Sequence, residues 1–521
     1  MAQSYNSKIL LIYLVKFVGI LTGFLSMLMV VPRLTTNPDI FGVYTVCISL
    51  SIFFSYADLG FLTAGQKYAA EYFAQKNLNK EMRVIGFVLF FFGVFMLISS
   101  TVLLFLAFNP EILIKSSKAE DVVISSKLLF ILAFSSVVVL FQRFNSLVYS
   151  IRIEDYIYQS IDVVGNILKI ISIQFFITKT NYDIVGYFFT QQIISLLCGI
   201  ICLYIAVKKY HYNIKQFLSY FRFSNDMYNL TKNLAFSSLL TTIAWILYFE
   251  LDALILGAYY GVKVVALYAI GFTLWSFLRS LYNAMYSPFL SRFNHFVGNK
   301  DEDGLYQTYS FLIKLTFPLC IIPSIVLIFY MENIIVTWVG YSYLPSVLIS
   351  QLYIITTALS SGLSVPINFL IIAKSQNAIL RFNAIILPLL FYSSLIVLNL
   401  YIGDKSLVVA KVITIFCGFA LILYAIYKIL GLRVLKLYGE ALKTIIFPIV
   451  VMAILFRLFP NSCDIVPKTF NAYFTLSWHM LPPLLLPLAI YYIMEAQTRN
   501  FLISKFKSVR IFKTKKKLFL F

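Results

Sequence analysis

The sequence contains few charged residues. They make up 12% of its 521 residues, whereas a soluble globular domain carries about 25%. Hydrophobic residues account for 60% of the chain. The longest polar stretches, near 208–232 and 497–521, hold about 25 residues each, which is too few to bury a hydrophobic core. This composition excludes a soluble protein and predicts an all-α polytopic membrane protein.

Motifs for ATP-driven work or for catalysis are also missing. The sequence has no GxxxxGK(S/T) phosphate-binding loop, and no segment outside the apolar runs is long enough to fold as an ATPase. No nucleophile, base and orienting group can be placed together. We therefore expect neither an enzyme nor a cofactor.

Histidine is scarce, and the cysteines show no pairing. The three histidines, His211, His295 and His479, lack the spacing of metal ligands. Five of the six cysteines lie in apolar runs and no CxxC pair occurs. Because free cysteine behaves as a small hydrophobe, these residues are interpreted as packing residues and no metal site is expected.

Long apolar runs fill most of the chain. A helix that crosses a bilayer needs about 20 mainly apolar residues, and the sequence offers fourteen candidate spans. They lie near 9–31, 41–64, 84–108, 128–150, 161–178, 182–207, 233–257, 264–290, 309–330, 344–372, 383–402, 406–427, 444–459 and 474–496.

Lysine and arginine predict the orientation of these spans. With the N-terminus in the cytoplasm, the cytoplasmic segments hold 27 of these residues and the outer segments hold 9. Basic residues concentrate on the cytoplasmic side of membrane proteins, so both termini are expected there. The same distribution accounts for the net charge of +20 without a nucleic-acid partner.

A weak internal repeat divides the predicted spans. Pro38–Tyr44 aligns with Val262–Tyr268 at a shift of 224 residues, the length of six spans. Six spans per half predict two bundles related by a parallel pseudo-repeat. The expected parts are an N-terminal six-helix bundle at 1–207, a basic cytoplasmic linker at 208–232, a C-terminal six-helix bundle at 233–430, two additional helices at 431–496 and a basic cytoplasmic tail at 497–521.

Charged residues inside the predicted spans are the main functional signal. Each one costs about 2.5–3.5 kcal/mol at the bilayer centre on insertion scales, so each needs a reason. The basic ones are Lys16, Arg143, Lys169, Arg279, Lys314 and Lys411, and the acidic ones are Asp58, Asp162, Glu250 and Asp252. They predict a polar cavity that contains more cations than anions.

Polar residues beside these charges form stripes along single helix faces. Asp162, Asn166 and Lys169 are spaced at i, i+4 and i+7 on the fifth predicted span. On the second predicted span, Ser51, Ser55 and Asp58 have the same spacing and share one face. Stripes of this kind predict helices that present one polar face to a cavity inside the bundle.

These observations give a set of candidate site residues. The expected substrate-binding cations are Lys16, Arg143, Lys169, Arg279 and Lys411, and the candidate ion-coupling carboxylates are Asp58, Asp162 and Asp252. For Arg143 and Lys411, which lie within about two turns of a span end, snorkelling to the membrane interface is the alternative. For Asp58, the alternative is a structural hydrogen bond to a neighbouring helix.

The first of two further motifs consists of Arg33, Pro38, Phe41-Gly42, Tyr44 and Asp58-Leu59-Gly60. It resembles the opening of the polysaccharide-unit flippases, a family that includes the O-antigen flippases and lies in the superfamily of the multidrug and toxin extrusion transporters. The second motif, Glu250–Gly257 followed by Tyr259 and Leu267–Ala269, is similar to their seventh and eighth spans. Ala253 stands where these proteins often have a basic residue.

The resemblance implies a flippase of the bacterial inner membrane. Such a protein would move oligosaccharide repeat units, linked to undecaprenyl diphosphate, to the outer leaflet for O-antigen or capsule synthesis. Its partners would be membrane lipids and polysaccharide polymerase or assembly proteins. A cavity dominated by carboxylates would instead favour a cation-coupled multidrug exporter. A large outer loop would favour a non-transporting component of polysaccharide assembly, but the longest, 109–127, has only about 19 residues.

Overall fold

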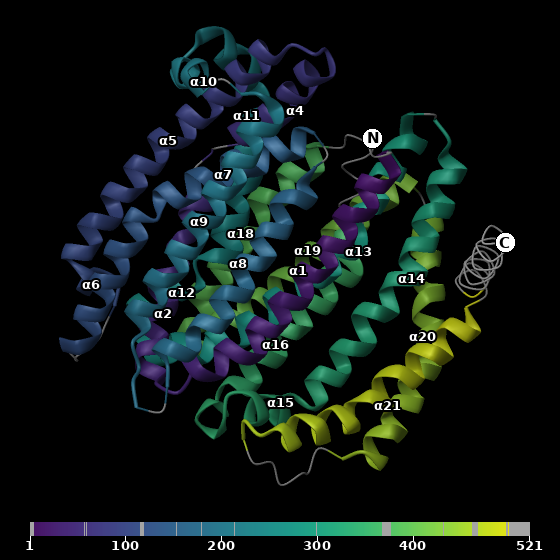
Figure 1. Cartoon of the computed structure of the whole chain (residues 1–521). Coiled ribbons are helices and arrows are strands. Elements are labelled where there is room, and N and C mark those ends of the chain that lie inside the picture. The colour runs from purple at the N-terminus through teal and green to yellow at the C-terminus, as the bar shows by residue number, and fades with distance from the viewer. Residues whose placement is uncertain are drawn as a thin grey trace, which may run out of the picture. The chain divides into compact units, whose positions relative to one another are not determined.

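The described part of the chain is almost entirely helical in the computed structural model (Figure 1). The structure describes residues 5–56, 58, 60–114, 119–152, 154–178, 180–212, 214–298, 300–366, 377–430, 432–460, 467–495 and 499. Within these ranges the one β-type contact is an isolated bridge between Ile177 and Tyr182. The predicted all-α class is therefore confirmed.

The chain divides into two compact units, Met1–Ala269 and Ile270–Phe521. The helices of the first unit are α1 (Tyr5–Leu34), α2 (Pro38–Ser49), α3 (Ser51–Tyr56), α4 (Phe61–Ala74), α5 (Leu78–Phe108), α6 (Ala119–Phe134), α7 (Ser136–Ile151), α8 (Asp155–Phe176), α9 (Ile184–Tyr210), α10 (Ile214–Tyr220), α11 (Asn225–Trp245) and α12 (Asp252–Tyr259). Three short helical segments complete the unit, namely η1 (Pro110–Ile112), the π-helix η2 (Ile246–Glu250) and the first turns of α13 (Val262–Gly298).

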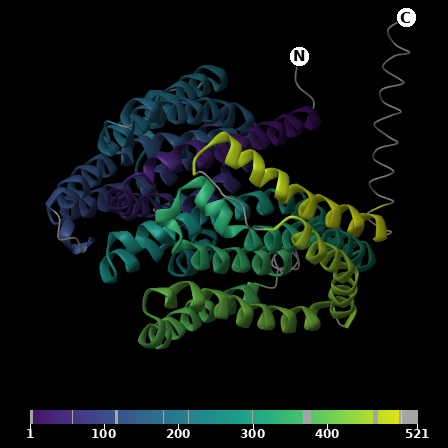
Figure 2. The same cartoon turned by 90° about the horizontal axis from the view of Figure 1, so that it is seen from below.

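The second unit continues from α13. Its further helices are α14 (Glu302–Phe329), α15 (Met331–Trp338), α16 (Ser346–Leu359), α18 (Asn377–Ile402), α19 (Ser406–Leu430), α20 (Leu432–Leu458) and α21 (Phe470–Met494), with η3 (Tyr341–Tyr343), the π-helix η4 (Ser360–Ser364) and η5 (Gly403–Lys405) between them. Figure 2 shows α18 and α19 as a pair of neighbouring helices, and α20 and α21 form a second pair.

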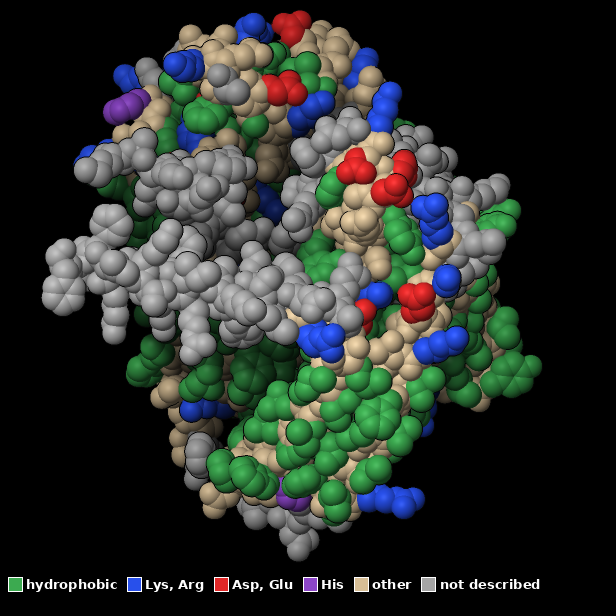
Figure 3. All heavy atoms as spheres, turned by 90° about the vertical axis from the view of Figure 1, so that its right-hand side faces the viewer, with side chains coloured by type: hydrophobic (Ala, Val, Ile, Leu, Met, Phe, Trp, Pro, Cys, Tyr) green, Lys and Arg blue, Asp and Glu red, His purple; other side chains and the backbone are tan. Residues whose placement is uncertain are grey.

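Many of these helices have the length and composition of membrane spans. In the part of the chain that the structure describes, nine helical stretches are long and apolar enough to cross a bilayer, or ten if the bent pair around Leu251 counts as one. Large apolar side chains on α20 and α21 are exposed, among them Phe447 and Trp478. Figure 3 shows apolar side chains gathered on the face that includes these helices. The chain is a multi-pass membrane protein, and the count of fourteen spans stays a prediction.

The second predicted span, 41–64, is broken rather than continuous. Helix α3 ends at Tyr56, and α4 begins at Phe61. Between them Gly60 adopts a left-handed backbone with φ 81°, which glycine reaches without a steric penalty. The Asp58 carboxylate accepts a hydrogen bond of 3.2 Å from the Leu62 amide. Asp58 therefore caps α4, and the prediction that it shares a helix face with Ser51 is wrong.

The two segments that the repeat relates approach each other closely within the first unit. A Cβ at Gly42 would lie 2.0 Å from the carbonyl oxygen of Val262, so only glycine fits at this position of α2. Beside this contact, the Lys263 ammonium lies 4.0 Å from the Asp39 carboxylate. The Phe41-Gly42 motif therefore permits backbone contact between α2 and the start of α13.

The predicted linker at 208–232 folds largely as helix. Helix α10 packs on α5, and α11 packs on α4. A Cβ at Gly86 of α5 would lie 2.8 Å from the Tyr220 carbonyl oxygen, which shows how closely the two backbones approach. The Phe91 ring also stacks on Tyr228. The segment 208–232 is therefore packed against the first unit, while the predicted boundaries of the two six-helix bundles stay a prediction.

Candidate functional site

The first unit contains a polar cavity of about 540 Å³. Its walls come from α2, α3, α6, α7, α8 and α9, so it lies among helices that are distant in sequence. The lining residues are Tyr44, Ile48, Ser51, Phe54, Leu132, Ser135, Val139, Gln142, Arg143, Ser146, Tyr158, Phe188, Gln191, Gln192 and Ser195. Hydroxyl, phenol, amide and guanidinium groups dominate this set, although it lies within strongly apolar helices.

Helices α7 and α9 provide the most polar part of the cavity wall, and the polar residues have the same spacing on both helices. Helix α7 contributes Gln142, Arg143 and Ser146 at i, i+1 and i+4, and α9 contributes Gln191, Gln192 and Ser195 at the same intervals. Residues at i and i+4 lie one above the other on a helix, and the residue at i+1 widens that face. Because α7 packs against α9, the two polar faces line one cavity.

Arg143 gives the cavity its charge. Among the described lining residues it is the one with an ionised side chain, and the others are neutral donors and acceptors or apolar groups. The Asp58 carboxylate lies close enough to the Arg143 guanidinium for the two charges to attract each other. The structure thus places two predicted site residues, Arg143 and Asp58, in one region, and Arg143 lines a cavity.

The polar stripe of the fifth predicted span is present on α8. The Asn166 side chain donates a hydrogen bond of 3.1 Å to the Asp162 carboxylate, and the Lys169 ammonium is attracted to the same carboxylate. The three residues form one local network. Tyr158, one turn before Asp162 on the same helix, lines the cavity.

Lys16 has a different environment. It is exposed on α1 and is attracted to the carboxylate of Asp155, the first residue of α8. Helices α1 and α8 lie side by side (Figure 1). This pairing places Lys16 near the start of α8 rather than among the cavity residues, and its role in substrate binding stays a prediction.

The remaining predicted cations, Arg279 and Lys411, lie in the second unit. The Arg279 guanidinium lies 4.8 Å from the ring centre of Trp275. Lys411 is 2% exposed, and its ammonium lies 5.9 Å from the ring of Tyr353 and 5.7 Å from that of Phe391. Cations over aromatic faces are stabilised by the ring quadrupole. A single cavity that gathers all five predicted cations stays a prediction.

Two further charged residues of the predicted spans, Asp252 and Lys314, lie outside the cavity wall. Asp252 is 6% exposed at the start of α12, in the first unit. Lys314 of α14 pairs with Glu495, at the end of α21, over 3.0 Å. In the described ranges no three His, Cys, Asp or Glu side chains converge as a metal site requires.

Sequence reasoning missed most of the cavity wall. Gln191 and Gln192 are consecutive amides within the apolar helix α9, and this pair could have been used to predict a polar lining at that point. Ser135, Ser146 and Ser195 gave no separate signal, because serine is common in membrane helices. Their role follows from the packing of α7 against α9.

Comparison with known proteins finds similar folds among solved structures of transporters. The sequence model of the MatE family matches residues 237–342. No curated protein sequence matches the chain. The structure of "Lipid II flippase MurJ, inward closed conformation" superposes with a TM-score of 0.63 at 16% identity, covering 94% of this chain and 99% of that one. The fold is shared with transporters of the MOP superfamily.

Two further structures show the same fold. A multidrug resistance MATE family transporter of the MOP superfamily, in an inward-facing conformation, matches with a TM-score of 0.57 at 14% identity over 77% of this chain and 94% of that one. A eukaryotic MATE transporter matches with a TM-score of 0.58 at 10% identity over 84% and 98%. The MOP fold therefore includes both a lipid flippase and multidrug transporters, and at these identities it does not separate their substrates.

Proposed function

We propose that this protein is a MOP-superfamily flippase that moves oligosaccharide repeat units, linked to undecaprenyl diphosphate, across the bacterial inner membrane for O-antigen or capsule synthesis. The observation that carries the proposal is the composition of the cavity wall, where the guanidinium of Arg143 lies among neutral amides and hydroxyls. A sugar-phosphate head group needs both kinds of contact, and its lipid tail can remain in the bilayer.

The neutral part of the wall suits carbohydrate. The amides of Gln142, Gln191 and Gln192 each offer donors and acceptors, as sugar hydroxyls do. Tyr44 and Phe188, which meet edge to face with ring centres 6.0 Å apart, supply aromatic surface for the apolar face of a sugar ring. The cavity volume of 540 Å³ falls within the range of about 300–1,000 Å³ that is usual for small-ligand sites.

The charged part of the wall suits phosphate. A guanidinium presents several donors in a planar fork, which matches the oxygens of a phosphate group. A lysine at the same position would offer a point charge with a less defined geometry. Arg143 is therefore the proposed contact for the diphosphate, and the nearby Asp58 is the proposed group that competes for it when the substrate is absent.

Transport would proceed by alternating access, with each protonation or ligand state favouring one conformation. The chain carries no phosphate-binding loop, so an ion gradient, removal of the product, or both would drive the cycle. Asp58, Asp162 and Asp252 remain the proposed ion-coupling residues. Both termini are proposed to lie in the cytoplasm, and polysaccharide polymerase or assembly proteins are the proposed partners.

The second candidate function is export of cationic drugs, because MATE transporters share the fold. A cation-binding cavity should present carboxylates, aromatic surface, or both. The described lining residues include aromatic groups but no carboxylate, and their charge is that of Arg143. Cavity charge therefore favours an anionic substrate.

The test compares Arg143→Gln and Arg143→Lys in a strain whose surface polysaccharide depends on this protein. We expect Arg143→Gln to reduce polysaccharide export and Arg143→Lys to retain part of it. Arg222→Gln, at an exposed arginine of the same unit, is the matched control and should export normally. Full export by Arg143→Gln at normal protein level, or efflux of cationic dyes by the wild type, would contradict the proposal.

A further inference from the structure

Helix α7 carries a second polar face that does not line the cavity. Asn145 and Tyr149 of α7 and Arg152, the residue that follows its last turn, are spaced at i, i+4 and i+7, so they share one side of the helix. At about 100° per residue, the centre of this face lies about 100° around the helix from the centre of the cavity face that contains Arg143. Asn145 and Tyr149 are fully buried, and Arg152 is 7% exposed.

The first two residues of this face hold α7 to the backbone of α9. The Asn145 amide donates a hydrogen bond of 2.9 Å to the Gly199 carbonyl oxygen. The Tyr149 hydroxyl donates one of 2.8 Å to the Cys202 carbonyl oxygen. Because both acceptors are backbone atoms three residues apart, the two bonds define the rotation and the height of α7 against α9.

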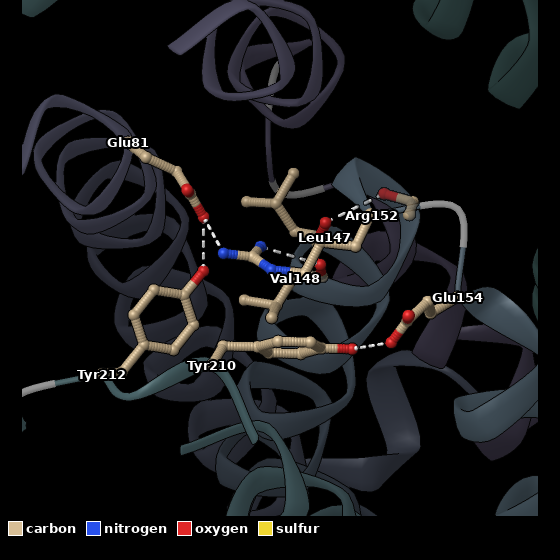
Figure 4. Close-up of polar contacts among 8 residues, drawn as sticks. Glu81, Leu147, Val148, Arg152, Glu154, Tyr210 and Tyr212 are labelled. Atoms are coloured by element: carbon tan, nitrogen blue, oxygen red, sulfur yellow. Dashed lines mark hydrogen bonds and ion pairs between the residues drawn. The ribbon is translucent and has the colours of Figure 1, made fainter. Parts of the chain in front are cut away.

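The third residue of this face holds α7 to α5. The Arg152 guanidinium lies 2.6 Å from the Glu81 carboxylate, and the two side chains are 5% and 1% exposed. Figure 4 shows Tyr212 pointing to the same carboxylate, to which its hydroxyl donates a hydrogen bond. The guanidinium also lies 4.3 Å from the ring centre of Tyr210. Arg152 is thus held on several sides.

Burial makes these bonds decisive for the position of α7. A buried donor or charge that loses its partner is strongly disfavoured, because no water can replace that partner. Rotating α7 by one residue position would separate all three side chains from their acceptors at once. It would also move Arg143, nine residues before Arg152, about 100° around the helix from its present place on the cavity wall.

We propose that Asn145, Tyr149 and Arg152, with Glu81, act as a register clamp that positions Arg143 in the cavity. They are positioning residues, since none of them lines the cavity. The expected effect of these residues on flipping rests on the proposed function, but their expected effect on the position of the cavity face of α7 does not. Weakening the clamp should change the exposure of the cavity face of α7 even when no substrate is present.

The experiment measures that exposure through a cysteine placed at Ser146, in full-length protein whose other cysteines are replaced. The rate of labelling by a polar maleimide is compared in the clamp variants Tyr149→Phe and Tyr149→Phe with Asn145→Leu. We expect the double variant to label at least about fivefold more slowly or more rapidly than its parent, and Tyr149→Phe alone to shift the rate in the same direction.

The matched control is Tyr182→Phe, because Tyr182 also donates to a helix carbonyl of the first unit, that of Leu34. It should leave the labelling rate unchanged. In a flipping assay that follows lipid-linked oligosaccharide, the clamp variants should raise the half-saturating concentration more than they lower the maximal rate.

The outcomes separate the two proposals. Unchanged labelling in the double variant, with or without a fall in thermal stability, would overturn the clamp. A fivefold change in labelling in the double variant would support the clamp. If the wild-type protein, assayed beside it, does not flip lipid-linked oligosaccharide, the proposed function is contradicted while the clamp stands. If the double variant does not fold, the single Tyr149→Phe variant decides, and the parental labelling rate in that protein would overturn the clamp.

Discussion

Removing the carboxylate of Glu81 should destabilise the first unit more than any surface substitution. In Glu81→Ala the Arg152 guanidinium, 5% exposed in the native protein, is left without the carboxylate that lies 2.6 Å away. Breaking a buried ion pair on one side costs about 3–5 kcal/mol. The Tyr212 hydroxyl loses its acceptor as well, and burial, which raises the pKa of this phenol, keeps it protonated and therefore in need of one.

The surroundings of Arg152 limit this loss. Its guanidinium keeps the aromatic contacts with Tyr210, at 4.3 Å, and Phe73, at 4.8 Å, and such contacts are worth about 2 kcal/mol when desolvated. These contacts already exist in the native protein, so they reduce the penalty for leaving the charge buried but do not replace the pair. We therefore expect a loss of about 3 kcal/mol, at the lower end of the range for buried pairs.

The assay is a double-mutant cycle on purified protein in detergent. By the scaling for domains of about 150–250 residues, a loss of about 3 kcal/mol lowers the unfolding midpoint by roughly 6–12 °C. The double variant Glu81→Leu with Arg152→Met removes both charges and keeps most of the volume, so it should lie near the wild type. The surface pair of Arg83 and Asp226, whose side chains are 45% and 75% exposed, gives the control. Arg83→Ala should change the midpoint by less than about 2 °C.

The result that would refute this reasoning is additivity. If Glu81→Leu and Arg152→Met, each made alone, lower the midpoint and the double variant falls by their sum, the two side chains are not coupled. A Glu81→Ala variant with the stability of the wild type would show that the carboxylate contributes nothing despite its burial.

Two further predictions follow from the fold and from the charge distribution. Gly42→Ala should abolish accumulation of folded protein, because the new Cβ would lie 2.0 Å from the Val262 carbonyl oxygen. Gly23→Ala is the control and should accumulate normally in the same immunoblot, because a Cβ at Gly23 would have nothing within 4 Å. Equal levels of the two variants would contradict the close approach of α2 to the start of α13. A single cysteine at Ser342 should react with an impermeant maleimide in intact cells, and one at His211 only after lysis, and labelling of the latter from outside would show that the orientation is reversed.

The sequence alone was sufficient for the class of the protein. Membrane helices satisfy their backbone hydrogen bonds internally and must be apolar where they face lipid, so each leaves a legible run of about 20 residues. The basic residues between the runs predict an orientation for the same local reason. The break at Asp58 could also have been predicted, because an aspartate followed closely by a glycine, here Gly60, commonly marks a helix boundary.

Tertiary structure was needed to separate cavity residues from interface residues. Arg143 lies near the end of a predicted span, where snorkelling and cavity lining are equally compatible with its position in the chain. Its role depends on α9, whose Gln191 and Gln192 face the same cavity. Periodicity reports which residues share a face of one helix, but it does not report which helix that face meets.

The ion pair of the register clamp could not be predicted from local sequence patterns either. Glu81 and Arg152 fall in segments predicted to be cytoplasmic connections, where charges are normally solvated, and they lie 71 residues apart. Local pattern therefore suggests two unrelated surface charges. Only the packing of α5, α7 and α9 buries both and brings them within 2.6 Å, because an ion pair between distant segments is determined by where the helices meet and not by the residues around either charge.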